Sequence, residues 1–428
     1  MQVRLDKRAR IIDEGGQAYP VDLLRDHTLK QIREKYTDEA GELTLEVGEE
    51  VPDDVVTIGG RVMFLRNTGK LCFTSLQDGF TESSNGERLQ VMLSKALVGE
   101  QALAAWKSDV DLGDFVWVKG FVARSRRGEL SVMATEWKMA SKALRPLPTL
   151  HKELGEETRV RRRYADLVAR EEARQMVRVR AAITRAIRTT LDELGFLEIE
   201  TPILQLVHGG AAARPFNTHL NAFDIDMSLR IALELYLKRA MVGGMDRVYE
   251  MGRVFRNEGI DSNHSAEFTM LEAYMSWGNQ FTIAEVIQQI IVRAADALGS
   301  RQIQTEQGVI DLGGQWQWVH VHPELSERLG REITLDTPAE ELRAIAAEHD
   351  VEIDPAWEAG KIVMELFGEI VEPTLIQPTF VCDYPAIAQP LARPHRDDPR
   401  MVEAWALIIG GMARGTGCSA RGDPGGPR

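Results

Sequence analysis

A short segment, residues 253–268, combines charged side chains with strand-like runs. It reads RVFRNEGIDSNHSAEF and places Arg256 beside Phe255 at the end of one apolar run. The next run, FTMLEAYM, places Glu272 and Tyr274 among hydrophobic residues, and alternation along a strand points these two side chains to the same face. A guanidinium fork binds carboxylates and phosphates, and carboxylates beside a phenol suit an amine. The pattern therefore predicts a site that holds an amino acid against a nucleotide phosphate.

Two interpretations of this segment compete. On an exposed sheet the charges would be cross-strand ion pairs, each contributing well under about 1 kcal/mol. The runs VYEMGRVF and FTMLEAYM are typical of buried strands, however, and buried charges are costly unless they are paired or used. We therefore favour a ligand site. The small residues of HGGAAARPF, at 208–216, would let a ligand approach the backbone closely, although such runs are equally typical of plain turns.

The elements that position these residues fall into three parts. Residues 1–54 are charged and helical in character, and residues 55–145 contain short β-rich runs separated by the turn signals NTGK, SSNGE and RRGE. These runs, with one helical stretch at 97–107, predict a small closed barrel of the oligonucleotide-binding (OB) type, and a β-barrel of another kind is the alternative. Residues 146–428 form a larger region of helices and strands, so the predicted fold class is α+β.

Within this larger region several elements have clear signatures. A helix at 171–194 repeats Ile183, Ile187 and Leu191 at helical spacing and stops at Gly195. FLEIETPIL predicts a strand reaching Pro202, and further predicted elements are a strand and helix in LRIALELYLKRAMVGG, a helix at 283–298 and a strand in PTFVCDYP. Residues 301–360 form a polar, partly helical insertion with no evident chemistry.

Composition excludes several function classes. A net charge of −14 over 428 residues argues against a protein that coats polyanions, so any nucleic-acid contact must come from local basic patches, for which the candidates are 124–129, 159–164 and 174–188. Each of these patches, taken alone, is more typical of a solvated surface. The cysteines, Cys72, Cys382 and Cys418, are odd in number and widely spaced, which predicts no disulfide framework and no metal site. With no signal peptide or membrane span, we expect a cytoplasmic protein.

Several longer phrases resemble one enzyme family. GFLEIETPIL is similar to motif 1 of the class II aminoacyl-tRNA synthetases, and FRNEG…EFTMLEAY is similar to their motif 2. HGGAAARPFNTHLNA, LRIALELYLKR, VGGMDRVYEMGRVFRNEGID and PTFVCDYP…PLARPHRDDP resemble lysyl-tRNA synthetases specifically. The resemblance extends over residues 1 to 424. It implies an anticodon-reading OB barrel, a class II antiparallel catalytic sheet flanked by helices, and a homodimer.

The resemblance also implies an activity and its residues. Lysine would attack the α-phosphate of ATP to form lysyl-adenylate, and the lysyl group would pass to tRNA(Lys). Arg256 would be the catalytic residue, clamping the carboxylate and the α-phosphate. The implied binding residues form three groups: Arg256, Glu258, His264 and Phe268 for ATP; Gly210, Glu234, Glu272 and Tyr274 for lysine; and Phe73, Gln90 and Glu129 for the anticodon. Phe73 also alternates like a barrel-core residue, which is the competing interpretation.

The sequence departs from the family near its end. Family members continue to a glycine-rich third motif that this chain does not reach, so the catalytic domain is expected to be incomplete. The family's magnesium-binding carboxylates correspond to Ala406 and Ala413, and alanine offers no hard oxygen ligand. Cys418 and Ala420 stand where the family places an aromatic and a lysine-binding glutamate. Ile387 replaces a glutamate, and the motif 2 loop reads NHSAEF in place of HNPEF.

Three functions remain open at this point. The chain is a lysine–tRNA ligase, a catalytically impaired paralogue that still binds tRNA, or a paralogue that activates another amino acid. The changed residues Cys418 and Ala420 line the expected side-chain pocket and motivate the third possibility.

Overall fold

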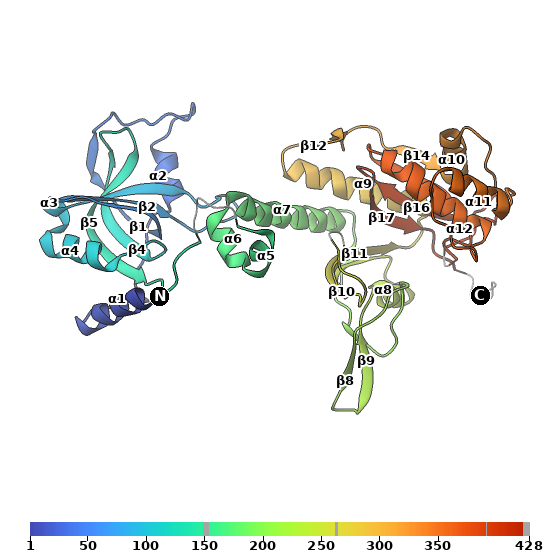
Figure 1. Cartoon of the computed structure of the whole chain (residues 1–428), viewed down its shortest axis with the longest axis horizontal. Helices are drawn as coiled ribbons and strands as arrows, with labels where there is room; N and C mark the ends of the chain where they lie inside the picture. Colours follow the sequence, from blue (N-terminus) through green and yellow to red (C-terminus); the bar gives the residue numbers. More distant parts are fainter. Residues whose placement is uncertain (149–153, 262–263, 391, 423–428) are drawn as a thin grey trace. The chain divides into compact units, whose positions relative to one another are not determined.

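The computed structural model describes residues 1–148, 154–261, 264–390 and 392–422. Asn263 of the NHSAEF loop and residues 423–428 thus lie outside the described residues. The chain divides into two compact units, residues 1–181 and 182–428 (Figure 1). No helix among the described residues is both long enough and apolar enough to cross a membrane.

The first unit contains a closed five-stranded barrel in the order β1-β2-β3-β5-β4. The strands are β1 (Glu50–Asn67), β2 (Leu71–Gln77), β3 (Arg88–Ser94), β4 (Phe115–Arg124) and β5 (Leu130–Ser141). The helices α3 (Lys95–Val98) and α4 (Glu100–Asp109) follow β3, where the sequence predicted one helical stretch. β1 begins five residues before the expected start of the barrel, because the pairs Glu50–Ala123 and Val51–Val122 extend its ladder with β4.

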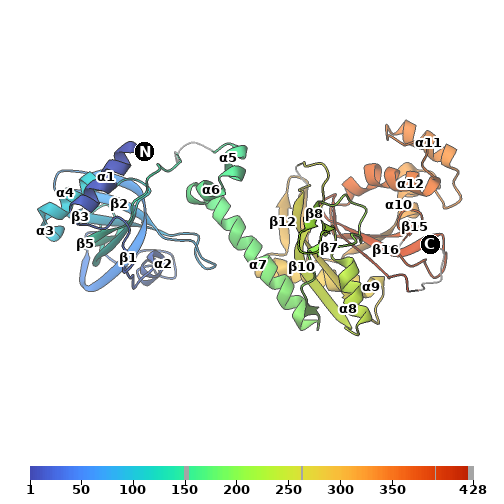
Figure 2. The ribbon, with the colours of Figure 1, turned by 90° about the horizontal axis from the view of Figure 1, so that it is seen from below.

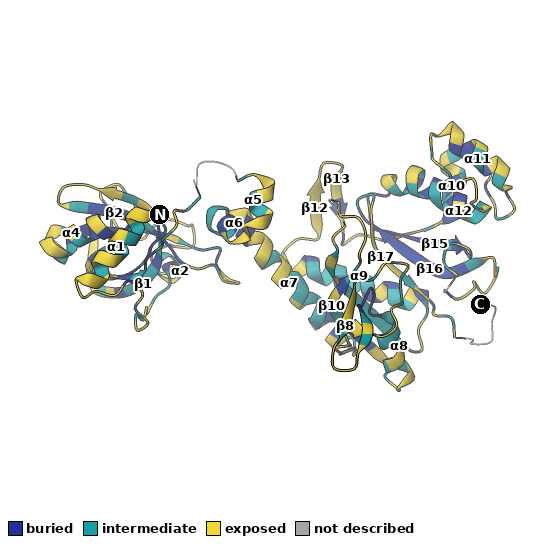
Figure 3. Ribbon diagram, turned by 60° about the horizontal axis from the view of Figure 1, so that its bottom comes forward, coloured by how far each residue is buried: buried dark blue, intermediate teal, exposed yellow. Residues whose placement is uncertain are grey.

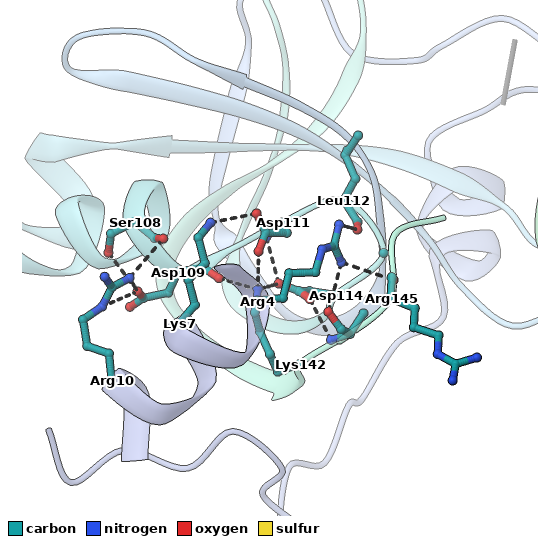
Figure 4. A network of polar contacts seen from close by, with 12 residues as sticks. Arg4, Lys7, Arg10, Ser108, Asp109, Asp111, Leu112, Asp114, Lys142 and Arg145 are labelled. Atoms are coloured by element: carbon teal, nitrogen blue, oxygen red, sulfur yellow. Dashed lines mark hydrogen bonds and ion pairs between the residues drawn. The ribbon is translucent and has the colours of Figure 1, made fainter. Parts of the chain in front are cut away.

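Two N-terminal helices, α1 (Gln2–Asp13) and α2 (Leu29–Lys35), accompany the barrel. The ammonium of Lys142 is fully buried and lies 2.6 Å from a carboxylate oxygen of Asp111 and 2.6 Å from one of Asp114 (Figure 4). Lys7 of α1 reaches the same Asp111 at 2.7 Å, and Arg4 donates to the Leu112 carbonyl at 2.9 Å. This shared set of carboxylates ties α1 to the α4–β4 connection of the barrel.

Two arginines of the predicted basic patches, Arg124 and Arg174, bind backbone carbonyls within the first unit. Arg174, in the helix α7 (Glu171–Glu193), is only 6% exposed and donates to the carbonyls of Asn85, Leu167 and Arg170. Arg124 donates to the carbonyls of Gly128 and Leu45. These two guanidiniums therefore brace the first unit from within, which corrects the expectation that they lie on a solvated surface or contact nucleic acid. The short helices α5 (Glu156–Arg161) and α6 (Arg163–Ala169) precede α7.

The predicted helix at 171–194 is confirmed as α7, and it ends where Gly195 adopts a φ of +79°. The predicted continuous strand to Pro202 is wrong, because only β6 (Leu197–Glu198) and β7 (Leu204–Gln205) form there. β6 joins a three-stranded sheet of order β11-β10-β6, and β7 joins β9 and β8. The strands concerned are β8 (Asn217–Leu220), β9 (Ile225–Leu229), β10 (Arg247–Phe255) and β11 (Glu267–Met275), and the helix α8 (Glu234–Val242) lies between β9 and β10 in sequence.

A second sheet has the order β14-β15-β16-β17, and its central strands are almost entirely buried (Figure 3). Its strands are β14 (Gln317–His320), β15 (Thr379–Pro385), β16 (Met401–Ile408) and β17 (Ala413–Cys418). β14 pairs in parallel with β15, and the remaining pairs are antiparallel. Helices cover both faces: α9 (Gln280–Ala297) on one, and α10 (Val321–Leu329), α11 (Ala339–Glu348) and α12 (Ala359–Leu366) on the other.

The polar insertion contributes more structure than the sequence indicated. It contains the small hairpin of β12 (Gln302–Thr305) and β13 (Gly308–Asp311), together with β14, α10 and α11. The apolar residues of α10 and α11 pack into the same core as β15 and β16. A π-helical turn, Phe367–Val371, and a 3-10 turn, Glu372–Thr374, lead from α12 toward β15.

Candidate active site

The runs VYEMGRVF and FTMLEAYM form two strands of one hairpin, β10 and β11. β10 and β11 pair antiparallel without a register shift, from Arg247 opposite Met275 to Phe255 opposite Glu267. The backbone N–H of Arg256 then donates to the Ala266 carbonyl at 2.9 Å, which extends the pairing one residue past the strands. The turn-rich residues between them form the long loop of the hairpin. This ladder fixes the position of Arg256 at the loop end of the hairpin.

One face of the hairpin collects the residues singled out from the sequence. Phe268, Met270 and Tyr274 of β11 pack in one cluster with Val248 and Val254 of β10, whereas Leu271, Ala273 and Met275 belong to the cluster behind. The predicted alternation along β11 is therefore confirmed. The expectation of buried strands is confirmed only in part, since β10 buries four of its nine residues and every residue of β11 is half-buried or exposed.

The guanidinium of Arg256 is held in place by two contacts. Its carbon lies 5.3 Å from the centroid of the Phe268 ring, a cation–π arrangement. Its Nε donates to the backbone carbonyl of Ile231 at 3.2 Å. A stacked and hydrogen-bonded guanidinium loses little further freedom when it engages an anionic ligand.

The Glu272 carboxylate accepts one hydrogen bond on each oxygen. The Leu233 N–H donates to Oε1 at 3.0 Å, and the Tyr274 hydroxyl donates to Oε2 at 2.9 Å. Burial raises the pKa of Glu272 above its usual 4.5, the nearby Glu234 raises it further, and Arg256 acts in the opposite direction. A cationic ligand would stabilise the ionised form of this partly buried carboxyl group, because it would supply the positive counter-charge that water no longer offers.

Glu234 opens α8, which packs against β10 and β11 (Figure 2). Its Oε1 accepts from the ammonium of Lys238, one turn later, at 2.6 Å. Gly210 adopts a φ of +87°, and a Cβ built there would lie 3.0 Å from the Cβ of Glu234. Only glycine therefore lets the 208–216 segment approach α8 this closely.

These side chains converge rather than scatter. Glu234 and Arg256 are both close enough to affect the ionisation of Glu272. The pKa of Tyr274 is raised mainly by burial, and the carboxylates of Glu272 and Glu234 raise it further. The thiol of Cys418 belongs to the same group: burial raises its pKa, Lys238 lowers it and Glu234 raises it. This cluster thus presents a guanidinium, two carboxylates and a phenol. Together these groups can hold a zwitterion with a cationic side chain.

Sequence reasoning missed a buried pair on this face, where Glu250 lies directly opposite Glu272 in the ladder. Arg230 and Glu250 lie 2.6 Å apart with 3% and 5% of their side chains exposed. Glu250 also accepts from the Thr201 hydroxyl at 2.6 Å, and Arg230 Nε donates to the Arg253 carbonyl at 2.8 Å. A Cβ at Gly252 would stand 2.3 Å from Arg230 Nη2, so the glycine makes room for the guanidinium. The sequence signal that could have found this pair is a single charged residue inside each of two apolar runs, Arg230 in LRIAL and Glu250 in VYEM.

Two predicted nucleotide contacts lie on the loop side. Glu258 is exposed, and its Oε1 accepts from the Arg214 N–H at 3.4 Å. His264 is exposed as well, and its Nδ1 lies 2.8 Å from a carboxylate oxygen of Asp261. The structure therefore places both on the loop after β10, outside the cluster formed by Arg256 and the carboxylates.

The barrel residues share one outer face. Phe73 is half-buried between the core residues Cys72 and Thr74, so it points away from the barrel core and the competing interpretation is wrong. Gln90 Nε2 donates to the Ser131 hydroxyl at 2.8 Å, and Ser131 in turn donates to the Glu129 carbonyl at 2.9 Å. β2 and β3 therefore place Phe73 and Gln90 one row apart on this face, and Glu129 immediately precedes β5, whose Ser131 pairs with Gln90.

A second aromatic on this face was missed. Phe64 is 54% exposed and pairs across the ladder with Ser75, which itself pairs with Gln90. Phe73 lies one row away, opposite Arg66. A bulge between Val62 and Phe64 shifts the alternation of β1, so the sequence pattern alone placed Phe64 ambiguously.

The positions expected to hold magnesium do not fit that ion. Ala406 is buried in β16 between Val381 and Thr416, and Ala413 opens β17, so neither offers an oxygen-bearing side chain. Burial raises the pKa of Glu372, which accepts a backbone hydrogen bond from Ala413. Magnesium binds several hard oxygen ligands, and the alanine side chains at these two positions supply none.

Comparisons with known proteins match both units. Residues 155–424 match the family model described as tRNA synthetases class II (D, K and N), and residues 56–140 match the OB-fold nucleic acid binding domain. The predicted fold class, an OB-type barrel followed by a class II synthetase domain, is confirmed by these matches.

Curated relatives cover nearly the whole chain. A lysine–tRNA ligase of Kineococcus radiotolerans is 52% identical over 99% of this chain and 83% of its own length. Lysine–tRNA ligase 1 of Mycobacterium tuberculosis (strain H37Rv) is 50% identical with the same coverage. The lysylphosphatidylglycerol biosynthesis bifunctional protein LysX of Rhodococcus jostii is 38% identical over 99% of this chain but 37% of its own length. The chain therefore belongs to the lysine–tRNA ligase family of the class II tRNA synthetases.

Proposed function

We propose that the chain is an ATP-dependent lysine–tRNA ligase. It would join lysine to the α-phosphate of ATP, breaking the bond to the leaving pyrophosphate, and then pass the lysyl group from the adenylate to the terminal hydroxyl of tRNA(Lys). The observation that carries this proposal is one cluster in a chain of this family: Arg256 and Glu272 both bond to the segment 231–233, Glu234 follows it directly, and Tyr274 bonds to Glu272.

Each group has a distinct part in the proposed first step. Arg256, stacked on Phe268, would bridge the lysine carboxylate and the α-phosphate and stabilise the negative charge that grows on the phosphoryl oxygens. Holding both reactants also converts an encounter in solution into a reaction between positioned groups. Phe268 would offer its ring to adenine, and Glu258 and His264 would meet the rest of ATP from the loop.

The carboxylates would recognise the two amines of lysine. Glu234 already accepts an ammonium group, that of Lys238, at 2.6 Å, which supports its assignment to the α-amine together with the Gly210 backbone. Glu272, oriented by the Tyr274 hydroxyl, would receive the side-chain ammonium. A paired cation is what a partly buried carboxylate needs, so lysine is favoured over neutral amino acids.

The outer face of the barrel would bind the anticodon. Single-stranded bases stack on aromatic rings and are read by hydrogen bonds along their edges. Phe73 offers the ring, and Gln90 and Glu129 offer polar groups. Phe64, exposed one row away from Phe73, would extend the same stacking surface to a neighbouring base.

We also propose that the protein acts in the cytoplasm as a homodimer. Exposed apolar side chains concentrate in the segment that includes β6 and β7: Leu197, Ile203, Leu204, Leu206 and Val207, with Val207 71% exposed. A concentration of exposed apolar side chains is typical of interaction sites. If so, Leu206→Asp combined with Val207→Asp converts the dimer to a monomer in light scattering, whereas Val242→Asp on exposed α8 leaves it intact.

A direct test is aminoacylation with tRNA(Lys), ATP and each amino acid in turn. Lysine is expected to give charged tRNA, and no charging with any amino acid would contradict the proposal. The position of Cys418 beside Glu234 and Tyr274 favours a second candidate, a ligase for another amino acid. Thermal stabilisation of the protein by amino acids in the presence of ATP distinguishes the two candidates, because only the preferred amino acid raises the melting temperature strongly.

A further inference from the structure

Four side chains unrelated to the proposed ligase site gather at the edge of the second sheet. β14 and β15 pair in parallel, which sets His320 directly beside Cys382. The Nδ1 of His320 lies 2.6 Å from Oδ2 of Asp383 and 3.4 Å from the sulfur of Cys382. His395 approaches the same carboxylate, with its Nε2 3.8 Å from Oδ1 of Asp383.

Backbone geometry turns these ligand atoms toward one another. Asp383 has a φ of +60°, in the left-handed region, and the β15–β16 ladder shifts register between Cys382 and Tyr384. A regular strand would point Cys382 and Asp383 to opposite faces. The bulge instead leaves one nitrogen, one sulfur and one carboxylate oxygen within 4.8 Å of one another. Residues other than glycine that are held in this region are found preferentially at binding sites.

The spacing suits a small tetrahedral metal ion. Zinc binds sulfur at about 2.3 Å and imidazole nitrogen or carboxylate oxygen at about 2.0–2.2 Å, so its ligand atoms stand roughly 3.4–3.6 Å apart. The 3.4 Å between Cys382 sulfur and His320 nitrogen already matches. The 2.6 Å between His320 and Asp383 must widen, and His320 can turn because 54% of its side chain is exposed.

We propose that His320, Cys382 and Asp383 form a site for a divalent transition metal of the zinc class, with His395 or water as the fourth ligand. The mixture of thiolate, imidazole and carboxylate favours zinc or cobalt over magnesium or calcium, which take oxygen ligands. Metal binding would release the thiol proton, since the ligand is the thiolate. The ion would join the ends of β14 and β15 to the loop that carries His395.

Cys382 is buried in a core cluster with Phe380 and Trp405, and the carboxylate of Asp383 beside it supplies the negative charge that a cation would need.

The alternative is an ion pair between His320 and Asp383 beside an inert core thiol. Cobalt(II) separates the two, because a cobalt–thiolate bond gives a sulfur-to-metal charge-transfer band. The full chain is treated with a chelator, dialysed and titrated with cobalt(II), and then with zinc to displace it. The proposal predicts the band in the wild type, its loss in Cys382→Ser, and an affinity at least about tenfold weaker in His320→Gln, given that even outer-shell partners of metal ligands are worth 10–100-fold.

Cys418→Ser is the matched control, because its thiol is exposed and lies at the proposed ligase site. Its band is expected to remain. Zinc should also raise the melting temperature of the wild type and of Cys418→Ser, but not that of Cys382→Ser or Asp383→Asn. No band in the wild type, or a band that persists in Cys382→Ser, would overturn the proposal. His320→Gln and Asp383→Asn replace more accessible side chains, so they keep the test decisive should Cys382→Ser fail to fold.

Discussion

The hydroxyl of Tyr274 donates a hydrogen bond to Glu272 at 2.9 Å, two residues apart on the same face of β11. The opposite oxygen of this carboxylate accepts from the Leu233 backbone, so both its position and its rotation are set before any ligand arrives. Burial raises the pKa of Glu272 above 4.5. The proposed recognition of lysine therefore depends on the ionisation of a single, preoriented group.

Lysine binding should consequently depend on pH. The ionised carboxylate binds the ammonium, so lysine affinity is expected to rise as the pH rises through the elevated pKa of Glu272 and then to level off. Glu272→Gln should weaken binding at least about tenfold, because removing one partner of a buried charge pair costs about 2–5 kcal/mol, and should abolish the pH dependence. Calorimetric titration with lysine from about pH 5 to about pH 8 measures both effects.

The free energy of unfolding should change with pH in the direction opposite to lysine affinity. A carboxyl group with a raised pKa in the folded state binds its proton more tightly folded than unfolded, so the free energy of unfolding decreases as the pH rises from about 4.5 to the folded pKa. Glu272→Gln should remove this decrease. Glu267→Gln on the exposed end of the same strand is the control, and an unchanged pH profile in Glu272→Gln would contradict the assignment.

The rings of Phe64 and Phe73, both on the outer face of the barrel, should contribute to tRNA binding. Base–aromatic stacking is worth about 1–3 kcal/mol per base, so Phe73→Ala and Phe64→Ala should each weaken tRNA affinity roughly 5- to 150-fold. Filter binding at fixed salt concentration measures the change. Val55→Ala, exposed on the same strand as Phe64, should have no effect. Normal affinity in Phe64→Ala with loss in Phe73→Ala would limit the surface to one ring.

The buried pair of Arg230 and Glu250 should hold the hairpin together. Glu250→Ala leaves a buried guanidinium unpaired, for which the expected loss in the free energy of unfolding is about 3–5 kcal/mol. The double variant Arg230→Met with Glu250→Leu should recover most of this loss, because it removes both charges. Urea denaturation measures these values, and a double variant as unstable as the single one would show that the charges are not the cause.

Local pattern was sufficient for much of this architecture. Alternation in FTMLEAYM gave the shared face of Glu272 and Tyr274, and turn signals delimited the barrel strands. It failed where a residue's partner is distant in sequence. Arg230 meets Glu250 through tertiary packing, and His320 meets Cys382 through a parallel strand pairing that no local signal encodes.

Irregular backbone accounts for the other misses. Phe64 and Asp383 both follow shifts in strand register, at which alternation no longer predicts the face. FLEIETPIL has the composition of a strand, yet only its ends lie in strands, β6 and β7. Ile199 still donates a backbone hydrogen bond to Tyr249, and the residues between it and β7 leave the sheet. In each case the tertiary environment decided what propensity alone left open.

The most direct test is lysine-dependent exchange of pyrophosphate into ATP by the purified chain and by Arg256→Ala. The wild type should catalyse exchange with lysine, and Arg256→Ala should reduce it by about 10²–10³-fold or more, as expected when a charge-stabilising donor is removed. Arg253→Ala, an exposed neighbour on β10, should exchange normally. Absence of exchange in the wild type, or equal exchange in Arg256→Ala, would contradict the proposed active site.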